Sequence, residues 1–250
     1  AQKKQGVVCS SAGNHAQGFA MSCSLLKIRG TVFMPVTTPK QKVSAVERLG
    51  KKYVEIILSG DTYDDAKNAA LKFTQKENKI FVSPFDHKLI IEGQGTVAAE
   101  ILEQIGKKKI DYIFVPIGGG GLAAGIITYF KEFSPITKII GVESQGAPAM
   151  LESMKKNKVI TLDKIDSFVD GAAVKQVGYQ TLPICKRGLE DIVLVPEGKV
   201  CTKILQLYNN DAIVVEPAGV LSIAALDFYK EQIKGKTVVC IVSGGNNDIE

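Results

Sequence analysis

Short runs rich in β-branched residues alternate with amphipathic stretches along almost the whole chain. This alternation is typical of βαβ units, and it predicts an α/β fold with mainly parallel sheets. Several runs are apolar throughout, as expected when helices cover both faces of a sheet. The runs expected to be strands are Gly6–Cys9, Thr31–Met34, Val54–Leu58, Ile80–Val82, Tyr112–Ile117, Lys138–Val142, Ile192–Val195, Ile213–Val215 and Thr237–Val242.

Composition argues against a nucleic-acid-binding, membrane-bound or disulfide-rich protein. The 250 residues are 45% hydrophobic and carry a formal charge of only +5, with lysines spread along the chain, so we expect no nucleic-acid partner. No uninterrupted apolar run reaches about 18 residues, and the polar, basic start lacks an apolar signal-peptide region, which predicts no membrane partner. The 5 scattered cysteines fit neither a disulfide framework nor a zinc site, so we expect a reducing, cytoplasmic location.

The strongest local feature is a strand that runs into the four glycines Gly118, Gly119, Gly120 and Gly121 and then into a helix. Glycines permit positive φ and remove Cβ atoms, so successive backbone N–H groups can face one anion at the positive end of a helix dipole. We therefore expect a phosphate-binding loop. The spacing from Gly119 to Ala124, with Glu143 about 20 residues on, also fits a dinucleotide-binding loop, so an NAD-binding protein stays open here.

Two other polar loops follow predicted strands. Ser10 to Gly18 comes after the first strand and opens a helix, where hydroxyl, amide and free backbone N–H groups suit a carboxylate or a phosphate. Ser11 or Asn14 would equally serve as a simple helix N-cap. Ser243 to Asn247 follows the last strand, at the strand end where open α/β sheets bind ligands. Together the loops predict one ligand held at several points, or two ligands side by side.

Six motifs occur in an order that resembles the tryptophan-synthase-β-like, or fold-type II, family of pyridoxal-phosphate enzymes, and most closely its threonine deaminases. The resemblance covers nearly the whole chain. It implies two open, mainly parallel doubly wound sheets, in a small domain of residues 1–79 and a large domain of residues 80–250, with the cofactor between them. The motifs are Ser11-Ala12-Gly13-Asn14-His15-Ala16-Gln17-Gly18, Pro84-Phe85-Asp86-His87 with Glu92-Gly93-Gln94-Gly95-Thr96, Gly118–Gly121, Asp170-Gly171-Ala172-Ala173-Val174, Glu216-Pro217-Ala218-Gly219 and Ser243-Gly244-Gly245-Asn246.

The resemblance also implies roles for individual residues. Asn14 would bond the pyridoxal 3-hydroxyl, and Ser243 would face the pyridine nitrogen, where a neutral hydroxyl favours elimination chemistry. The residues expected to hold the cofactor phosphate are Gly118, Gly119, Gly120, Gly121 and Leu122. Those expected to bind the substrate carboxylate are Ser11, Gly13, Asn14 and His15.

The implied reaction is the dehydrative deamination of L-threonine to 2-oxobutanoate and ammonia, in isoleucine biosynthesis, by a homo-oligomeric lyase. L-Serine is the expected secondary substrate. The family's Schiff-base lysine belongs to an S-x-K-x-R-G segment upstream of the asparagine loop, and the 250 residues contain no such segment. We therefore assign no catalytic residue, interpret the chain as an incomplete catalytic region, and expect negligible lyase activity from it alone.

Several alternatives remain at this point. A serine dehydratase or serine racemase of the same family is one, although Ala12 stands where racemases use a serine as an acid/base, and a methyl group moves no proton. Another is a non-catalytic NAD- or amino-acid-binding α/β protein. The only histidines, His15 and His87, lack metal-ligand spacing, so we expect no metal and a structural hydrogen bond from His87. The acidic Glu143, Asp170 and Glu216 would either line a cleft or cation site or cap helices.

Overall fold

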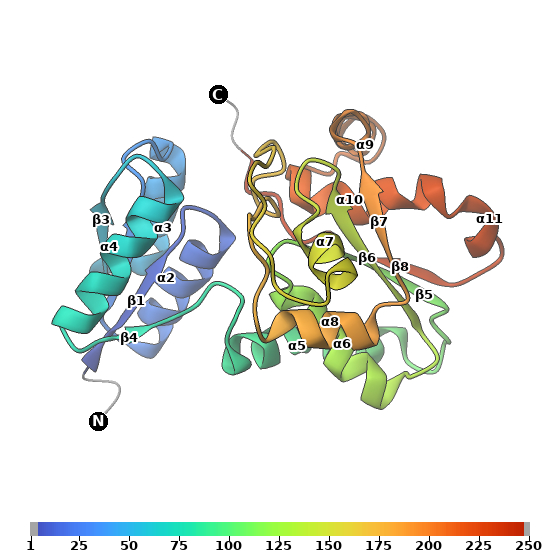
Figure 1. The fold of residues 1–250 in the computed structure, drawn as a ribbon, viewed down its shortest axis with the longest axis horizontal. Helices are drawn as coiled ribbons and strands as arrows, with labels where there is room; N and C mark the ends of the chain where they lie inside the picture. Colours follow the sequence, from blue (N-terminus) through green and yellow to red (C-terminus); the bar gives the residue numbers. More distant parts are fainter. Residues whose placement is uncertain (1–4, 248–250) are drawn as a thin grey trace. The chain divides into compact units, whose positions relative to one another are not determined.

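The computed structural model describes residues 5–247, which form two compact units (Figure 1). The first unit extends to Pro84, and the second is Phe85–Asn247. The sequence predicts the boundary after Lys79. The division falls later because the short strand β4 (Ile80–Phe81) pairs with β1 (Val7–Ser10) in the sheet of the first unit.

The sheet of the first unit has the strand order β3-β2-β1-β4, and every pair is parallel. Buried side chains alternate between its faces: Cys9 packs with the α2 and α3 side, whereas Val8 packs with α4. The sheet is therefore doubly wound, as predicted. Its other elements are β2 (Gly30–Met34), β3 (Val54–Leu58), α2 (Asn14–Leu26), α3 (Lys40–Gly50), η1 (Lys51–Tyr53) and α4 (Tyr63–Lys76).

The second unit repeats this plan with the parallel order β7-β6-β5-β8. One face of the sheet packs on α5 to α8, and the other packs on α9 and α10. The two cores confirm the predicted doubly wound architecture. The elements are α5 (Lys88–Ile105), β5 (Tyr112–Pro116), α6 (Gly121–Phe133), β6 (Lys138–Ser144), α7 (Ala149–Lys155), α8 (Thr181–Gly188), β7 (Asp191–Val195), α9 (Glu197–Asp211), α10 (Pro217–Ala225), η2 (Leu226–Phe228), α11 (Lys230–Ile233) and β8 (Val238–Cys240).

One predicted strand is wrong. Residues Ile213–Val215 lie in an irregular segment between α9 and α10. Their neighbour is a loop and not a strand edge, so the backbone here makes isolated bonds. Glu216 N donates to Gly244 O at 3.1 Å, and the Asn247 side chain donates to Val215 O at 2.7 Å. Only Val215 of the three is buried, whereas Ile213 and Val214 are exposed, so the β-branched composition here does not reflect membership of a sheet.

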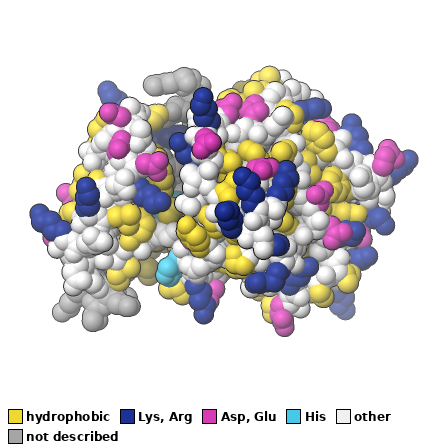
Figure 2. All heavy atoms as spheres, in the orientation of Figure 1, with side chains coloured by type: hydrophobic (Ala, Val, Ile, Leu, Met, Phe, Trp, Pro, Cys, Tyr) yellow, Lys and Arg dark blue, Asp and Glu magenta, His cyan; other side chains and the backbone are white. Residues whose placement is uncertain are grey.

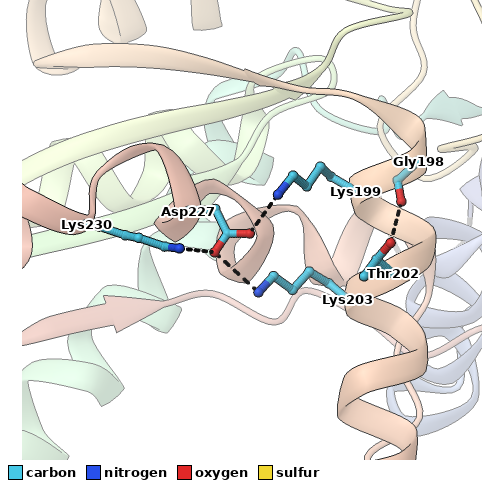
Figure 3. A network of polar contacts seen from close by, with 6 residues as sticks. All are labelled: Gly198, Lys199, Thr202, Lys203, Asp227 and Lys230. Atoms are coloured by element: carbon cyan, nitrogen blue, oxygen red, sulfur yellow. Dashed lines mark hydrogen bonds and ion pairs between the residues drawn. The ribbon is translucent and has the colours of Figure 1, made fainter.

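Charged groups tie α9 to the segment after α10 (Figure 3). Lys199, Lys203 and Lys230 place their ammonium groups 3.2, 3.4 and 3.7 Å from the Asp227 carboxylate. Burial acts to raise the pKa of Asp227, but Lys199 and Lys203 outweigh it and hold that pKa below its ordinary value. Figure 2 shows basic, acidic and apolar side chains interspersed on the visible face.

None of the helices within residues 5–247 is both long enough and apolar enough to cross a membrane. All 5 cysteines have free thiols, and Cys9 packs inside the first core as predicted for a small hydrophobic residue.

Candidate functional site: loops at the strand ends

In each sheet, successive strands are added on one side of the first strand, and the last strand is added on its other side. In the first unit the chain moves from β1 to β2 and β3 and then returns to place β4 on the other side of β1. In the second unit β5 and β8 are related in the same way. The carboxyl ends of such strand pairs form the crevice where open α/β sheets bind ligands. The loops that follow β1, β5 and β8 therefore occupy the two places where sites are expected.

The tetraglycine loop after β5 presents a set of unpaired donors. Gly120 precedes α6 with φ +92°, a left-handed conformation that favours glycine, and no side chain caps this helix. The first backbone bond of the helix joins Ala124 N to Gly120 O at 2.8 Å. The N–H groups of Gly121, Leu122 and Ala123 consequently have no partner within the helix, and they lie at the positive end of its dipole.

The opposite side of this loop is filled with protein. A Cβ on Gly119 would lie 2.3 Å from Phe85 Cγ, and one on Gly121 would lie 2.9 Å from Phe85 Cβ. A Cβ on Gly120 would lie 2.6 Å from Met150 Cε. The glycines thus allow close packing behind the loop as well as free N–H groups in front of it, and this arrangement fits the phosphate group of a cofactor.

The loop after β1 is built differently. Ser11 N donates to Phe33 O at 3.2 Å, and the Ser11 hydroxyl accepts the N–H of Gly13 at 3.1 Å. Gly13 precedes α2 without any side-chain cap, and Asn14 is exposed at the first helical position. Ser11, Gly13, Asn14 and His15 therefore share one edge of the first sheet, at the start of α2, where the first N–H groups of a helix have no partner within the helix itself.

His15 links this loop to the strand across the crevice. Its Nε2 lies 3.3 Å from the carbonyl oxygen of Val82, directly after β4. Burial lowers the pKa of His15, and the bond to Val82 offsets this only in part. The imidazole is therefore neutral at pH 7 and engaged with backbone, so the backbone N–H is the group that His15 can offer to an anion.

Ser243 follows β8 at the same edge of the second sheet as the tetraglycine loop, since β8 pairs with β5. Its side chain is exposed. The next residues are held in place by Glu216, whose N–H donates to Gly244 O at 3.1 Å and whose carboxylate accepts Asn246 N at 3.0 Å. Glu216 thus orders the loop that carries the Ser243 hydroxyl.

Glu143 is fully buried at the end of β6, and its two carboxylate oxygens accept Met150 N at 2.7 Å and Leu151 N at 2.9 Å. Burial raises the pKa of Glu143 to about 7, although the two bonds act to lower it. The carboxylate caps α7 and is not free to bond a ribose hydroxyl, which argues against a dinucleotide site. Residues 5–247 contain no cluster of His, Cys, Asp and Glu suited to a metal ion.

The other polar residues weighed from sequence have local roles. Asp170 accepts the N–H of Gly171 at 2.8 Å. His87 caps α5 through Nδ1, which accepts Leu89 N at 3.3 Å, so its predicted structural role is confirmed. The residues that pack behind the tetraglycine loop were not predicted as site residues. Met150 and Thr181 lie far from it in sequence, and only Phe85, within a family motif, carried a signal.

Comparison with known proteins identifies the class. The family described as pyridoxal-phosphate dependent enzyme matches residues 1–244, so the chain belongs to this family. It is 62% identical to the "L-threonine dehydratase biosynthetic IlvA" of Halalkalibacterium halodurans over 98% of this chain and 59% of the relative. The protein of the same name in Bacillus subtilis is 57% identical over 99% of this chain and 58% of the relative.

A solved structure agrees with these matches. The processed form of threonine deaminase isoform 2 from Solanum lycopersicum superimposes with a TM-score of 0.94 at 38% identity, covering 99% of this chain and 71% of that one. The predicted family and fold are confirmed. The chain spans less than two thirds of the length of the two bacterial relatives.

Proposed function

We propose that the protein functions in the dehydrative deamination of L-threonine to 2-oxobutanoate and ammonia, with pyridoxal phosphate as cofactor and L-serine as a secondary substrate. The tetraglycine loop carries the proposal, because the first N–H groups of α6 have no partner within the helix while every Cβ position at Gly119, Gly120 and Gly121 is filled by protein. The choice of threonine is supported by the names of the bacterial relatives, which share 62% and 57% of their aligned residues with this chain.

In the second unit, the N–H groups of Gly118 to Gly121 and of Leu122 hold the cofactor phosphate, and the exposed hydroxyl of Ser243 meets the pyridine nitrogen. Bound pyridoxal phosphate supplies an electron sink for the bonds at the α-carbon of an amino acid. Ser243 is neutral, so it stabilises no positive charge on that nitrogen, and this favours elimination of a β-hydroxyl over chemistry that needs a full carbanion.

In the first unit, the start of α2 receives the substrate carboxylate. The Ser11 hydroxyl, held by the N–H of Gly13, and the N–H groups of Asn14 and His15 supply the donors, and the helix dipole adds to their field. The exposed Asn14 amide also bonds the pyridoxal 3-hydroxyl. Ala12, which is half-buried in the same loop, carries no group that transfers a proton, so deamination is favoured over racemisation.

We also propose that the protein acts as a homo-oligomer in the cytoplasm, in a biosynthetic pathway. The word biosynthetic in the names of the bacterial relatives supports the pathway.

The test begins with titration of pyridoxal phosphate into the protein, followed by visible absorbance. We expect saturable binding, competition by inorganic phosphate, and a spectral change on adding L-threonine but not D-threonine. Reduction with borohydride and mass spectrometry then maps any modified lysine, and we expect no specific adduct within these residues. Binding of NAD without binding of pyridoxal phosphate would contradict the proposal, and a single cleanly trapped lysine would contradict the assignment of no catalytic residue.

A further inference from the structure

Thr181 lies fully buried behind the tetraglycine loop, at the first position of α8. Its hydroxyl donates to Gly119 O at 2.7 Å, and Gly178 N donates to the same carbonyl at 3.1 Å. A glycine carbonyl that would otherwise be free to rotate thus has two protein donors. This is notable at a place where glycine leaves the backbone with the widest choice of conformations.

The direction of this carbonyl determines the direction of an N–H group. The peptides are trans, so the carbonyl of Gly119 and the N–H of Gly120 point in opposite directions. The bond to Thr181 therefore turns the Gly120 N–H away from the core. The next carbonyl, of Gly120, accepts Ala124 N at 2.8 Å and is 4.0 Å from Cys185 Sγ. Two successive peptides are consequently held with their donors on the ligand side.

Thr181 is itself held by the turn before α8. The carboxylate of Asp86 accepts Tyr179 N at 2.9 Å and Gln180 N at 2.8 Å. A Cβ on Gly178 would lie 2.4 Å from Asp86 Oδ1, so this segment is closely packed. The Thr181 hydroxyl therefore reaches Gly119 from a closely packed backbone, and its second acceptor, Gly178 O, is more distant at 3.2 Å.

We propose that Thr181 is a positioning residue for the cofactor phosphate. It acts through the peptide between Gly119 and Gly120 and does not touch the ligand itself. The inference rests on the proposed function, because it takes the tetraglycine loop as the phosphate site. Without the hydroxyl, the peptide would populate other orientations, and binding would have to select the competent one.

The test compares Thr181→Val, which keeps the shape and removes the donor, with Thr181→Ser, which keeps the donor. Each protein is titrated with pyridoxal phosphate and with pyridoxal, which lacks the phosphate. For Thr181→Val we expect the Kd for pyridoxal phosphate to rise about tenfold, while the Kd for pyridoxal stays within about twofold. Thr181→Ser should restore most of the affinity, and the phosphorus NMR signal of the bound cofactor should broaden only in Thr181→Val.

Thr128→Val is the matched control, because the Thr128 hydroxyl also donates to a backbone carbonyl, Ala124 O at 2.8 Å, in the same helix α6. It should leave both Kd values unchanged. An equal loss for both ligands in Thr181→Val would mean a merely structural role and would overturn the inference, as would unchanged binding of pyridoxal phosphate. If the wild-type protein binds no pyridoxal phosphate, the proposed function fails and this inference fails with it.

Should Thr181→Val not fold, Thr181→Cys takes its place beside Thr181→Ser, since a thiol is a weaker donor than a hydroxyl. A phosphate-selective loss in Thr181→Cys alone supports the inference. Equal affinities in the two variants overturn it.

Discussion

The loop after β1 and the loop after β5 occupy equivalent positions in two similar sheets, yet they are packed in opposite ways. Each follows a parallel strand beside the point where the strand order reverses, and each opens a helix that no side chain caps. Behind the tetraglycine loop, Cβ atoms on Gly119 and Gly120 would approach protein atoms to 2.3 and 2.6 Å. In the other loop, a Cβ on Gly13 would meet nothing within 4 Å.

This difference in packing indicates that the topology provides a place for an anion, while the packing behind the loop decides how rigidly the anion is held. The tetraglycine loop is closed from behind by Phe85, Met150 and Thr181, as suits the proposed site of a cofactor phosphate. The loop from Ser11 to Asn14 is open, as suits the proposed site of an exchanging substrate carboxylate. Substitutions that add or remove single groups in each loop can break or sharpen this comparison.

The largest effect is expected from Gly120→Ala. An alanine here would have to adopt the left-handed φ of +92°, which is strained for a residue with a Cβ, and its methyl group would lie 2.6 Å from Met150 Cε. We expect pyridoxal phosphate to bind at least about 100-fold more weakly and the protein to lose about 2–4 kcal/mol of stability. Ligand titration and urea unfolding measure the two.

Gly18→Ala is the matched control for that change, because Gly18 lies within α2 and a Cβ there meets nothing within 4 Å. It should stabilise the protein by about 0.5–1 kcal/mol, through better helix propensity. If Gly120→Ala and Gly18→Ala changed the stability in the same direction or by the same amount, the tetraglycine loop would not be closed from behind.

Glu143→Gln tests the support under Met150. Glutamine has one acceptor oxygen where the carboxylate has two, so one of the two N–H groups at the start of α7 loses its partner. We expect the free energy of unfolding at pH 7 to fall by about 1–3 kcal/mol. Glu103→Gln, at an exposed position of α5, should change it by less than about 0.5 kcal/mol.

A comparison of the wild-type protein with Glu143→Gln also reports the ionisation of Glu143. Its pKa in the folded protein, about 7, lies above the ordinary value of 4.5, so the folded state binds the proton more tightly. The contribution of this group to stability is therefore complete below pH 4.5 and is lost as the pH rises through about 7. Denaturant unfolding from pH 4.5 to 8 should show the stability of the wild-type protein falling relative to that of Glu143→Gln. If the wild-type protein instead gained stability relative to Glu143→Gln as the pH rises, the raised pKa of Glu143 would be contradicted.

Ser11→Ala should act on the open loop alone. It removes the acceptor of the Gly13 N–H and one donor of the proposed carboxylate site. We expect the Kd for L-threonine, titrated into protein loaded with cofactor, to rise about tenfold, while the Kd for pyridoxal phosphate stays within about twofold. Ser22→Ala, at an exposed position of α2, the helix that follows this loop, should change neither value. A comparable loss for the cofactor would show that the two loops do not have separate tasks.

The smallest effect is expected from Asp227→Asn, away from both loops. It leaves Lys199, Lys203 and Lys230 without their shared carboxylate (Figure 3). We expect a loss of about 0.5–1 kcal/mol that shrinks at high salt, with no change in ligand binding. Because the folded pKa of Asp227 is lowered, this contribution is present at neutral pH and is lost as the pH falls below about 4. Altered cofactor affinity would link this surface to the site.

Sequence patterns predicted most of the strands and both kinds of loop, because these depend on residues close together in the chain. The failure at Ile213–Val215 has the same origin: three β-branched residues show a preference for extended backbone, but not whether a strand lies beside them. Glu143 shows the other limit. Its place at the end of β6 fitted either a ligand contact or a helix cap, and only the fold shows the carboxylate turned toward α7.

The chain by itself determined the α/β class, the glycines at which an anion can approach the backbone, and the family, since each depends on local periodicity or on motifs of a few residues. The tertiary structure decided which strands are neighbours, and hence that the loops after β1, β5 and β8 lie where the strand order reverses. It also placed Thr181 against Gly119, 62 residues away. Local preference contains no record of such pairs, because they form only when distant segments pack together.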